Sequence, residues 1–275
     1  MPEGHSIHRA AIDQRRELVG DSIRTSSPQG RFEEVGLLDR RVLVEIDAWG
    51  KHLFYRFAPR GRARKDTWLH VHLGLYGGFT RHASLPPPPP HGAVRLRMIG
   101  ARVAIDLAGP TVCEVLDDKG RAAVLARLGP DPLRKTRDGG DGREAARRLH
   151  ASGRPIGGLL LDQSLVAGIG NVYRAEILFL AGIDPARAGS ELSAGELANV
   201  WGLSKTLLAA GVRDGRIDTA QFLRGADDVE AMPGRRGRSK RTLVYHQHTC
   251  RRCGEAIRTG TMGARTLFWC PHCQQ

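Results

Sequence analysis

The periodicity of the apolar residues changes near residue 128, and this change constrains the fold more than any other feature of the sequence. Three segments before it are β-branched and alternate between apolar and polar residues, as strands do: residues 40–57, 67–81 and 94–116. Four segments after it have apolar residues at helical spacing: residues 143–152, 155–166, 171–182 and 193–215. The sequence between them, LGPDPLRKTRDGGDG, has the composition of a linker.

An α+β multidomain protein follows from this pattern. Residues 6–19 predict a helix, and the strands after it predict a β-sandwich or flattened barrel. We expect a β-sandwich domain over residues 1–125, a linker over 126–142, a helical domain over 143–233 and a cysteine-containing module over 234–275. A basic linker, GRRGRSKR, opens the last module.

Four of the five cysteines form two CxxC pairs, Cys250 with Cys253 and Cys270 with Cys273, separated by sixteen residues. This spacing is typical of a four-cysteine Zn²⁺ site, and we expect one structural ion whose binding folds the module. Cys113 is expected to be a buried small apolar residue. Because the count is odd and no secretory signal opens the chain, we expect a reducing, cytoplasmic compartment.

The net charge is +13 at pH 7, with a pI near 10.3. Such an excess indicates a polyanionic partner, and nucleic acid is the simplest one. A solvated basic surface in an Arg-rich proteome is the plainer alternative. A membrane surface is disfavoured because the chain contains no run of 18 apolar residues.

Two local patterns fit a phosphate partner. Gly168 and Gly170 form a tight turn before a helix that starts at Asn171, and free backbone N–H groups at such a helix start can bind phosphate. The alternative is an ordinary helix–turn–helix connection. Residues 257–269 predict a hairpin with Gly263 at its turn, which would hold Arg265 near the tip.

Five short motifs occur in one order along the whole chain: an N-terminal Pro-Glu-Gly, a Gly-Lys in a strand hairpin, LGPDPL, GIGNVYRAE and GTMGARTLFWCPHCQ. With them the chain resembles the formamidopyrimidine-DNA glycosylase/endonuclease VIII family, and its Pro-Glu-Gly start resembles the endonuclease VIII branch. The resemblance implies a two-layer antiparallel β-sandwich, a helix-two-turn-helix domain and a hairpin zinc finger, with DNA bound between the two halves.

The activity implied by the resemblance is that of a bifunctional DNA glycosylase and abasic-site lyase of base excision repair. In this family Met1 is removed and the amine of Pro2 becomes the nucleophile. An amine that attacks C1′ expels the base and forms an iminium, after which β,δ-elimination cleaves the strand. We expect oxidised pyrimidines such as 5-hydroxyuracil and thymine glycol as substrates.

The resemblance also assigns roles to individual residues. Glu3 would be the general acid. Lys51 would reach the damaged nucleotide and its phosphate, and Asn171 and Arg265 would bind phosphates beside the lesion. For each of them an ordinary surface role is the alternative.

Base excision requires the nucleotide to leave the stack, and a wedge must fill the gap. Leu75 and Tyr76 resemble that wedge, although they could equally be strand residues. Arg174 is expected to face the DNA. A base-recognition loop is expected between residues 215 and 241.

Two other functions explain part of the sequence. A catalytically silent protein that binds damaged DNA could share the fold. A zinc-ribbon factor that binds RNA or the ribosome would explain the cysteines and the charge, but it would not explain Pro2, Glu3, Lys51 and GIGN together. We expect a monomer whose partner is damaged DNA, in duplex, bubble or single-stranded form.

Overall fold

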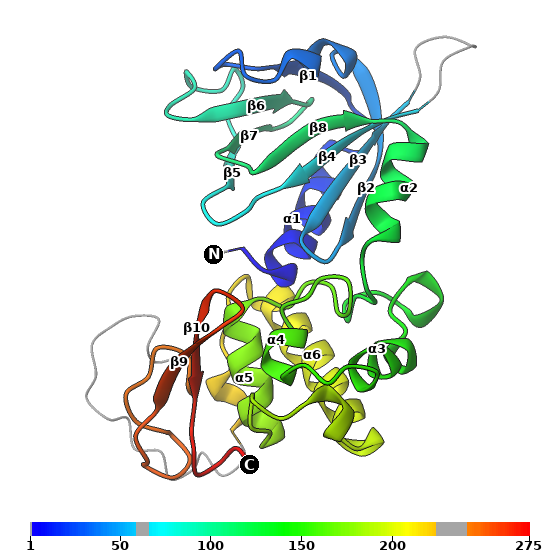
Figure 1. Cartoon of the computed structure of the whole chain (residues 1–275). Helices are drawn as coiled ribbons and strands as arrows, with labels where there is room; N and C mark the ends of the chain where they lie inside the picture. The colour runs from blue at the N-terminus through cyan, green and yellow to red at the C-terminus, as the bar shows by residue number, and fades with distance from the viewer. Residues whose placement is uncertain (1, 59–65, 224–240) are drawn as a thin grey trace. The chain divides into compact units, whose positions relative to one another are not determined.

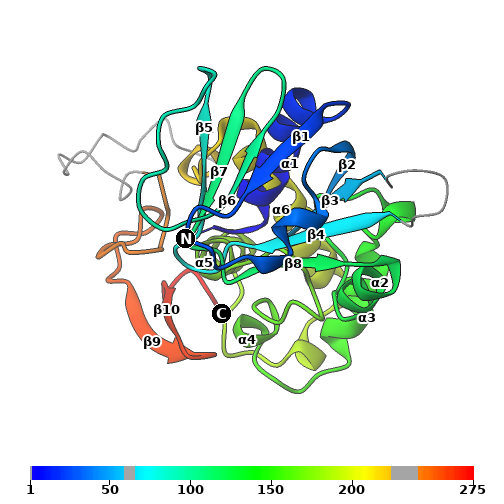
Figure 2. The ribbon, with the colours of Figure 1, turned by 90° about the horizontal axis from the view of Figure 1, so that it is seen from above.

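The computed structural model describes residues 2–58, 66–223 and 241–275. The chain divides into two compact units, Met1–Arg127 and Leu128–Gln275. Each unit is described by itself (Figures 1 and 2).

The first unit contains one long helix and an eight-stranded antiparallel sheet with the strand order β5-β7-β6-β1-β2-β3-β4-β8 (Figure 1). Its elements are α1 (Gly4–Leu18), β1 (Ser22–Ser26), η1 (Glu33–Leu37), β2 (Arg41–Trp49), β3 (His52–Phe57), β4 (Thr67–His72), β5 (Gly78–His82), β6 (Val94–Ile99), β7 (Ala104–Ala108), β8 (Val112–Leu116) and α2 (Asp118–Ala126).

Strand β1 joins the two layers of the sandwich. Its first residues pair with β2 and its last residues pair with β6. The core between the layers includes Ile23 of β1, Leu43 of β2 and Leu96 of β6, all without exposed surface. Helix α1 closes this core, and its Gln14 accepts a hydrogen bond of 2.7 Å from the Tyr55 hydroxyl. The predicted helix and two-layer sandwich are confirmed.

The second unit is helical and ends in a hairpin. Its elements are η2 (Thr136–Asp138), α3 (Gly142–His150), α4 (Ile156–Leu159), α5 (Asn171–Ala181), η3 (Gly189–Glu191), α6 (Ala194–Asp214), η4 (Ala220–Phe222), β9 (Arg258–Met262) and β10 (Arg265–Trp269). Its main core packs α3, α5 and α6 together around Tyr173, Ile177 and Leu208. No helix within the described ranges is long and apolar enough to cross a bilayer.

The helix predicted over residues 155–166 is much shorter in the structure. Helix α4 covers only Ile156–Leu159. Beyond its end, the Asp162 side chain accepts hydrogen bonds from both the backbone N–H and the hydroxyl of Ser164. Such an Asx-turn competes with the helical backbone pattern. The apolar residues after it form a turn that leads to α5.

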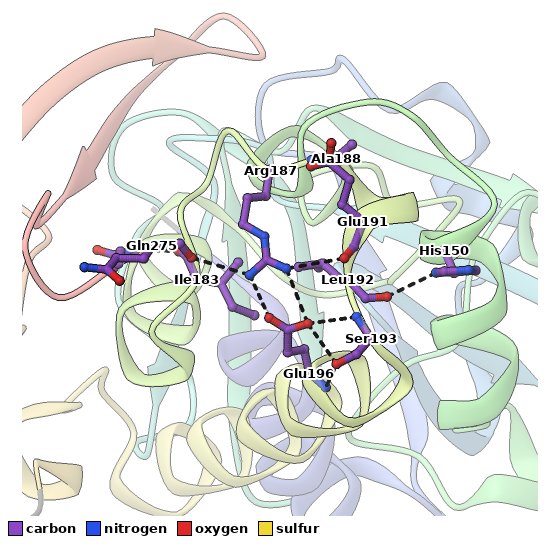
Figure 3. Close-up of polar contacts among 10 residues, drawn as sticks. His150, Ile183, Arg187, Ala188, Glu191, Leu192, Ser193, Glu196 and Gln275 are labelled. Atoms are coloured by element: carbon purple, nitrogen blue, oxygen red, sulfur yellow. Dashed lines mark hydrogen bonds and ion pairs between the residues drawn. The ribbon is translucent and has the colours of Figure 1, made fainter.

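A polar network fixes the start of α6 (Figure 3). Ser193 and Glu196 form a capping box, in which each side chain bonds the other residue's backbone N–H. Arg187 binds the same carboxylate at 2.7 Å and also donates to the backbone oxygen of Gln275 at 3.4 Å. Arg187 and the Ser193 donors lower the pKa of Glu196 to about 2. The network ties the α6 start to the C-terminal residue.

Candidate functional site

The N-terminal tip places a buried carboxyl beside the predicted nucleophile. Pro2 is half-buried, and Glu3 has no exposed surface. Glu3 directly precedes α1, and its backbone oxygen accepts hydrogen bonds from the N–H and hydroxyl of Ser6. Its carboxylate does not cap the helix. The side chain is therefore held at a helix start, where the helix dipole favours negative charge.

Lys51 lies at the tip of the β2–β3 hairpin. Gly50 takes a positive φ of 57°, which allows the tight turn before the lysine. Burial, followed by the charge of Lys51, lowers the pKa of His72 in β4. The Nδ1 of His72 accepts the Gly74 N–H at 3.2 Å, so its Nε2 carries the hydrogen when the ring is neutral. The hairpin tip thus combines a cation with a neutral N–H donor.

His72 was missed by sequence reasoning. The available signal was the alternation HVH in residues 70–72, which places two histidines on one face of a strand. The same face carries His52 of β3, opposite His72 in the strand register.

Leu75 and Tyr76 lie in the turn that connects β4 and β5, rather than in a strand. Their side chains are 44% and 92% exposed. The turn depends on its glycines, because a Cβ on Gly77 would approach the backbone oxygen of Leu73 to 2.3 Å. A phenol ring this exposed has almost no packing role within the chain.

The GIGN turn of the second unit precedes α5. Gly168 takes a φ of 94°, and its N–H donates to the side chain of Gln163 at 2.9 Å. The amide of Gln163 also donates to the backbone oxygen of Ile169 at 3.0 Å, so one side chain holds the turn. Gly170 is the residue before the helix, and Asn171 is its first residue.

Arg174 does not face solvent, and the expectation that it faces DNA is wrong. Its side chain has no exposed surface. The guanidinium donates to the backbone oxygens of Met262 and Thr266 at 3.1 and 3.0 Å, and to Oδ1 of Asn171. Asn171 in turn donates from Nδ2 to Thr266 at 2.9 Å. The planar guanidinium has five N–H donors in a fixed arrangement and can bond several carbonyl oxygens at once. Arg174 therefore binds α5 to the hairpin.

The β9–β10 hairpin is confirmed. Met262 pairs with Arg265 across a two-residue turn in which Gly263 and Ala264 have φ values of 62° and 55°. This is the backbone geometry of a tight hairpin turn. Arg265 is exposed at the first position after it. Through Arg174, the structure joins the predicted phosphate ligands Asn171 and Arg265 into one assembly.

The four predicted ligand cysteines converge. Their sulfur atoms all lie within 4.8 Å of one another. Cys250 and Cys273 are 3.9 Å apart, and Cys253 and Cys270 are 3.5 Å apart. A tetrahedral zinc ion with bonds of about 2.3 Å to sulfur requires sulfurs about 3.8 Å apart. The donor set and its spacing fit Zn²⁺.

Glu176, the last residue of the GIGNVYRAE motif, was also missed. It is fully buried, and its carboxylate accepts backbone hydrogen bonds of 2.7, 3.0 and 2.9 Å from Leu243, Val244 and Tyr245, besides one from the Thr219 hydroxyl. Burial raises its pKa, and these donors oppose that effect. Most of the predicted base-recognition loop and basic linker, residues 224–240, lie outside the described part of the chain.

Comparisons with known proteins agree over the whole chain. Residues 1–106 match the formamidopyrimidine-DNA glycosylase N-terminal domain, and residues 128–222 match the formamidopyrimidine-DNA glycosylase H2TH domain. Endonuclease 8 1 of Mycobacterium tuberculosis is 43% identical over 280 residues, covering all of both chains.

Solved structures give the same result for the fold. The MutM (Fpg) protein of Thermus thermophilus is similar with a TM-score of 0.76 and 27% identity, over 99% of this chain and 98% of that one. The Lactococcus lactis Fpg in complex with DNA containing an oxidized pyrimidine has a TM-score of 0.77 over all of both chains. At 22% sequence identity, this similarity supports the fold alone.

Proposed function

The chain belongs to the formamidopyrimidine-DNA glycosylase/endonuclease VIII family as an endonuclease VIII-like DNA glycosylase and abasic-site lyase of base excision repair, and we propose that it removes oxidised pyrimidines through Pro2. The observation that carries the proposal is the full-length similarity to endonuclease 8 1, together with the buried Glu3 next to Pro2. Displacement of the base by the Pro2 amine and strand cleavage are two stages of one covalent reaction.

Pro2 supplies the nucleophile after Met1 is removed. Its secondary amine attacks C1′, the bond from C1′ to the base breaks, and the opened sugar remains as an iminium. The permanent positive charge of this iminium withdraws electrons and acidifies the C2′ proton. Loss of that proton expels the 3′ phosphate, and a second elimination expels the 5′ phosphate.

Glu3 provides the proton for ring opening. The Glu3 carboxyl has no solvent contact, so it would exchange protons with groups packed against it. In the complex with DNA, the sugar ring oxygen would be such a group. Protonation of that oxygen assists attack at C1′. The same carboxyl then takes part in later proton transfers.

DNA is held through its phosphates. Lys51 and the Nε2 hydrogen of His72 provide donors in the first unit, and the GIGN turn with Asn171 and Arg265 provides donors in the second. The second N–H of the Asn171 amide serves this purpose, since only one bond is used by Thr266. Affinity should therefore fall steeply with salt.

Leu75 and Tyr76 fill the space left by the extruded nucleotide. An exposed aromatic ring on a glycine-flanked turn can stack against neighbouring bases and offset the cost of unstacking. The structure of the turn supports this role because the two side chains have little packing to lose.

One structural Zn²⁺ is held by Cys250, Cys253, Cys270 and Cys273. The ion stabilises the fold of the finger that carries Arg265 and supplies no reaction step.

Borohydride trapping on an oligonucleotide with a single abasic site tests the proposal. The expected product is a covalent adduct that maps to Pro2 by mass spectrometry, in protein whose N-terminal mass lacks Met1. An adduct on a lysine, or tight salt-sensitive binding without any adduct, would contradict the assigned nucleophile. Excision of 5-hydroxyuracil compared with an oxidised purine tests the substrate class.

A further inference from the structure

Residues 86–90 are five consecutive prolines in the connection between β5 and β6, and they have no part in the proposed reaction. We call them the proline segment. The proline ring fixes φ at about −65°, and a residue that precedes a proline is held at extended ψ values. Together these restraints impose a polyproline II helix, which rises about 3.1 Å per residue. The proline segment is therefore a stiff rod about 15 Å long.

The proline segment is presented to solvent and is not tied to the rest of its unit. Four of its prolines are exposed, and Pro87 is half-buried. Leu85, directly before the segment, is 40% exposed. Residues 84–92 form no hydrogen bond within the part of the chain that the structure describes. A partner can therefore reach most of the segment without displacing an internal hydrogen bond.

The path of the connection does not by itself require such a rod. Strand β7 lies between β5 and β6 in the sheet, so the connection crosses one strand, a distance of about 10 Å. About three extended residues of any kind span that distance. Prolines that protect a sheet edge stand within the edge strand, whereas Pro86 follows the end of β5 by four residues. Neither a spacer nor edge protection accounts for five prolines.

The chemistry of the proline segment favours a protein partner over DNA. Proline has no backbone N–H, so the segment offers carbonyl acceptors and apolar rings. Phosphates also only accept hydrogen bonds, so the DNA backbone is not a ligand for it. Grooves lined with aromatic side chains do bind polyproline II helices. Their rings pack on proline, and Trp and Tyr add donors for the carbonyl oxygens.

The charges near the proline segment indicate what should surround such a groove. The stretch between Asp66 and Asp106 contains no acidic residue and four arginines. His91 directly follows the segment and is exposed. A groove with acidic residues at its rim therefore complements the sequence around the segment.

The proline segment is separated from the proposed DNA wedge. Strand β5 leads from the turn that carries Leu75 and Tyr76 to the connection that contains the segment (Figure 1). The five residues of β5, Gly78–His82, span about 15 Å. A groove can therefore bind the segment while the exposed Tyr76 ring contacts DNA.

We propose that Leu85 and the proline segment form a docking ligand for a partner protein whose groove is lined with aromatic residues and rimmed with acidic ones. The partner binds while the glycosylase holds DNA. This inference does not depend on the proposed nucleophile or substrate. Because the segment is already restrained, it loses little conformational freedom on binding, which favours affinity from a short contact.

Calorimetric titration of the whole protein with isolated WW and SH3 domains tests the docking ligand, because both bind polyproline II helices in aromatic-lined grooves. We expect saturable binding by at least one of them. Pro88→Ala combined with Pro89→Ala, both at exposed positions, should weaken that binding about tenfold or more, since alanine restores flexibility and N–H groups. Pro28→Ala, at an exposed position of the same unit, is the matched control and should bind like the wild type.

Binding by neither domain, or equal binding by the wild type and the double variant, would overturn the proposal. Base excision and melting temperature of the double variant should equal those of the wild type. If they fall and neither domain binds, the proline segment is an internal spacer.

The same titration on protein bound to DNA with a stable abasic analogue tests simultaneous binding. The affinity for the domain should equal that of the free protein. Displacement of the DNA by the domain, or loss of domain binding in the complex, would place the proline segment in the DNA interface and overturn the proposal.

Discussion

Glu3 is fully buried and directly follows Pro2, the proposed nucleophile. These two properties distinguish it from the acids within α1, the helix that it precedes. A carboxyl that only stabilised the helix start would accept hydrogen bonds from its first turn, and Glu3 does not cap the helix. The geometry therefore favours a role in proton transfer.

Glu3→Gln should lower base excision by a factor of about 100 or more, because the amide cannot donate the proton for ring opening. Cleavage at a preformed abasic site should fall much less, since the sugar of an abasic site opens to its aldehyde without the enzyme. Single-turnover assays on both substrates measure the difference. Asp13→Asn, which changes an acid paired with Arg9 on the same helix, serves as the control. Equal losses on both substrates would count against the general-acid role.

The position of Arg174 could not be predicted from its neighbours in the sequence. A basic residue in the first turns of a helix at a predicted phosphate site suggests DNA contact, and nothing within the helix reveals that the carbonyls of residues 262 and 266 will accept its hydrogen bonds. Only the packing of the hairpin on α5 decides this, and that packing joins segments about 90 residues apart.

Arg174→Lys should loosen the hairpin on α5, because one ammonium cannot replace the fork that serves Asn171, Met262 and Thr266. We expect a loss of about 2–3 kcal/mol in unfolding free energy and weaker DNA binding. Urea unfolding and a binding titration measure the two effects. The exposed Arg137→Lys should change neither.

Among the elements, the long and strongly periodic ones were predictable. The first helix, the β2–β3 hairpin, α5, α6 and the zinc hairpin follow from apolar spacing and turn glycines. Strand β1 and helix α2 were missed. In β1 only Ile23 is buried, so its sequence carries little alternation, and its role depends on pairing with β2 and β6.

The placement of site residues was predictable where one short motif specifies it, as at the cysteines and at the GIGN turn before α5. The catalytic roles of Pro2 and Glu3 stay predictions. The contact between Glu114 and His70 could not be predicted in the same way. Glu114 meets His70 only because β8 pairs with β4, and no local pattern specifies which strands become neighbours. The histidines therefore looked like ordinary strand residues.

The Glu176 carboxylate of α5 accepts hydrogen bonds from three backbone N–H groups of the segment after residue 241, beside an apolar cluster that joins the same two parts. Glu176→Gln should destabilise the second unit by about 3 kcal/mol, because the amide turns a donor toward groups that can only donate. Thermal unfolding should show the loss. Glu144→Gln, which changes a half-buried acid of α3 paired with Arg147 and Arg148, should cost much less stability. Equal melting temperatures for Glu176→Gln and the wild type would show that the carboxylate does not carry this connection.

At the scale of the whole molecule, metal removal tests how the zinc finger contributes to DNA binding. A strong chelator, or Cys270→Ser, should release one Zn²⁺ and unfold the hairpin, since so short a module depends on metal binding by its four converging cysteine sulfurs to fold. DNA affinity should then fall at least tenfold, because the arginine at the hairpin tip loses its placement. Metal analysis and a binding titration at fixed salt measure both. Retained metal and affinity in Cys270→Ser would refute the zinc assignment.

We expect the cysteine cluster to make the protein sensitive to the agents that create its proposed substrates. Oxidants that damage pyrimidines also convert thiolates to sulfenic acids and disulfides. Cys253 is exposed, and its sulfur lies 3.5 Å from that of Cys270, so oxidation at one ligand has a ready partner for a disulfide. Such a disulfide would expel the ion and unfold the finger, which could then no longer bind DNA. Capacity for repair would then decline as the oxidative burden on the DNA rises, unless a reductant restores the thiols.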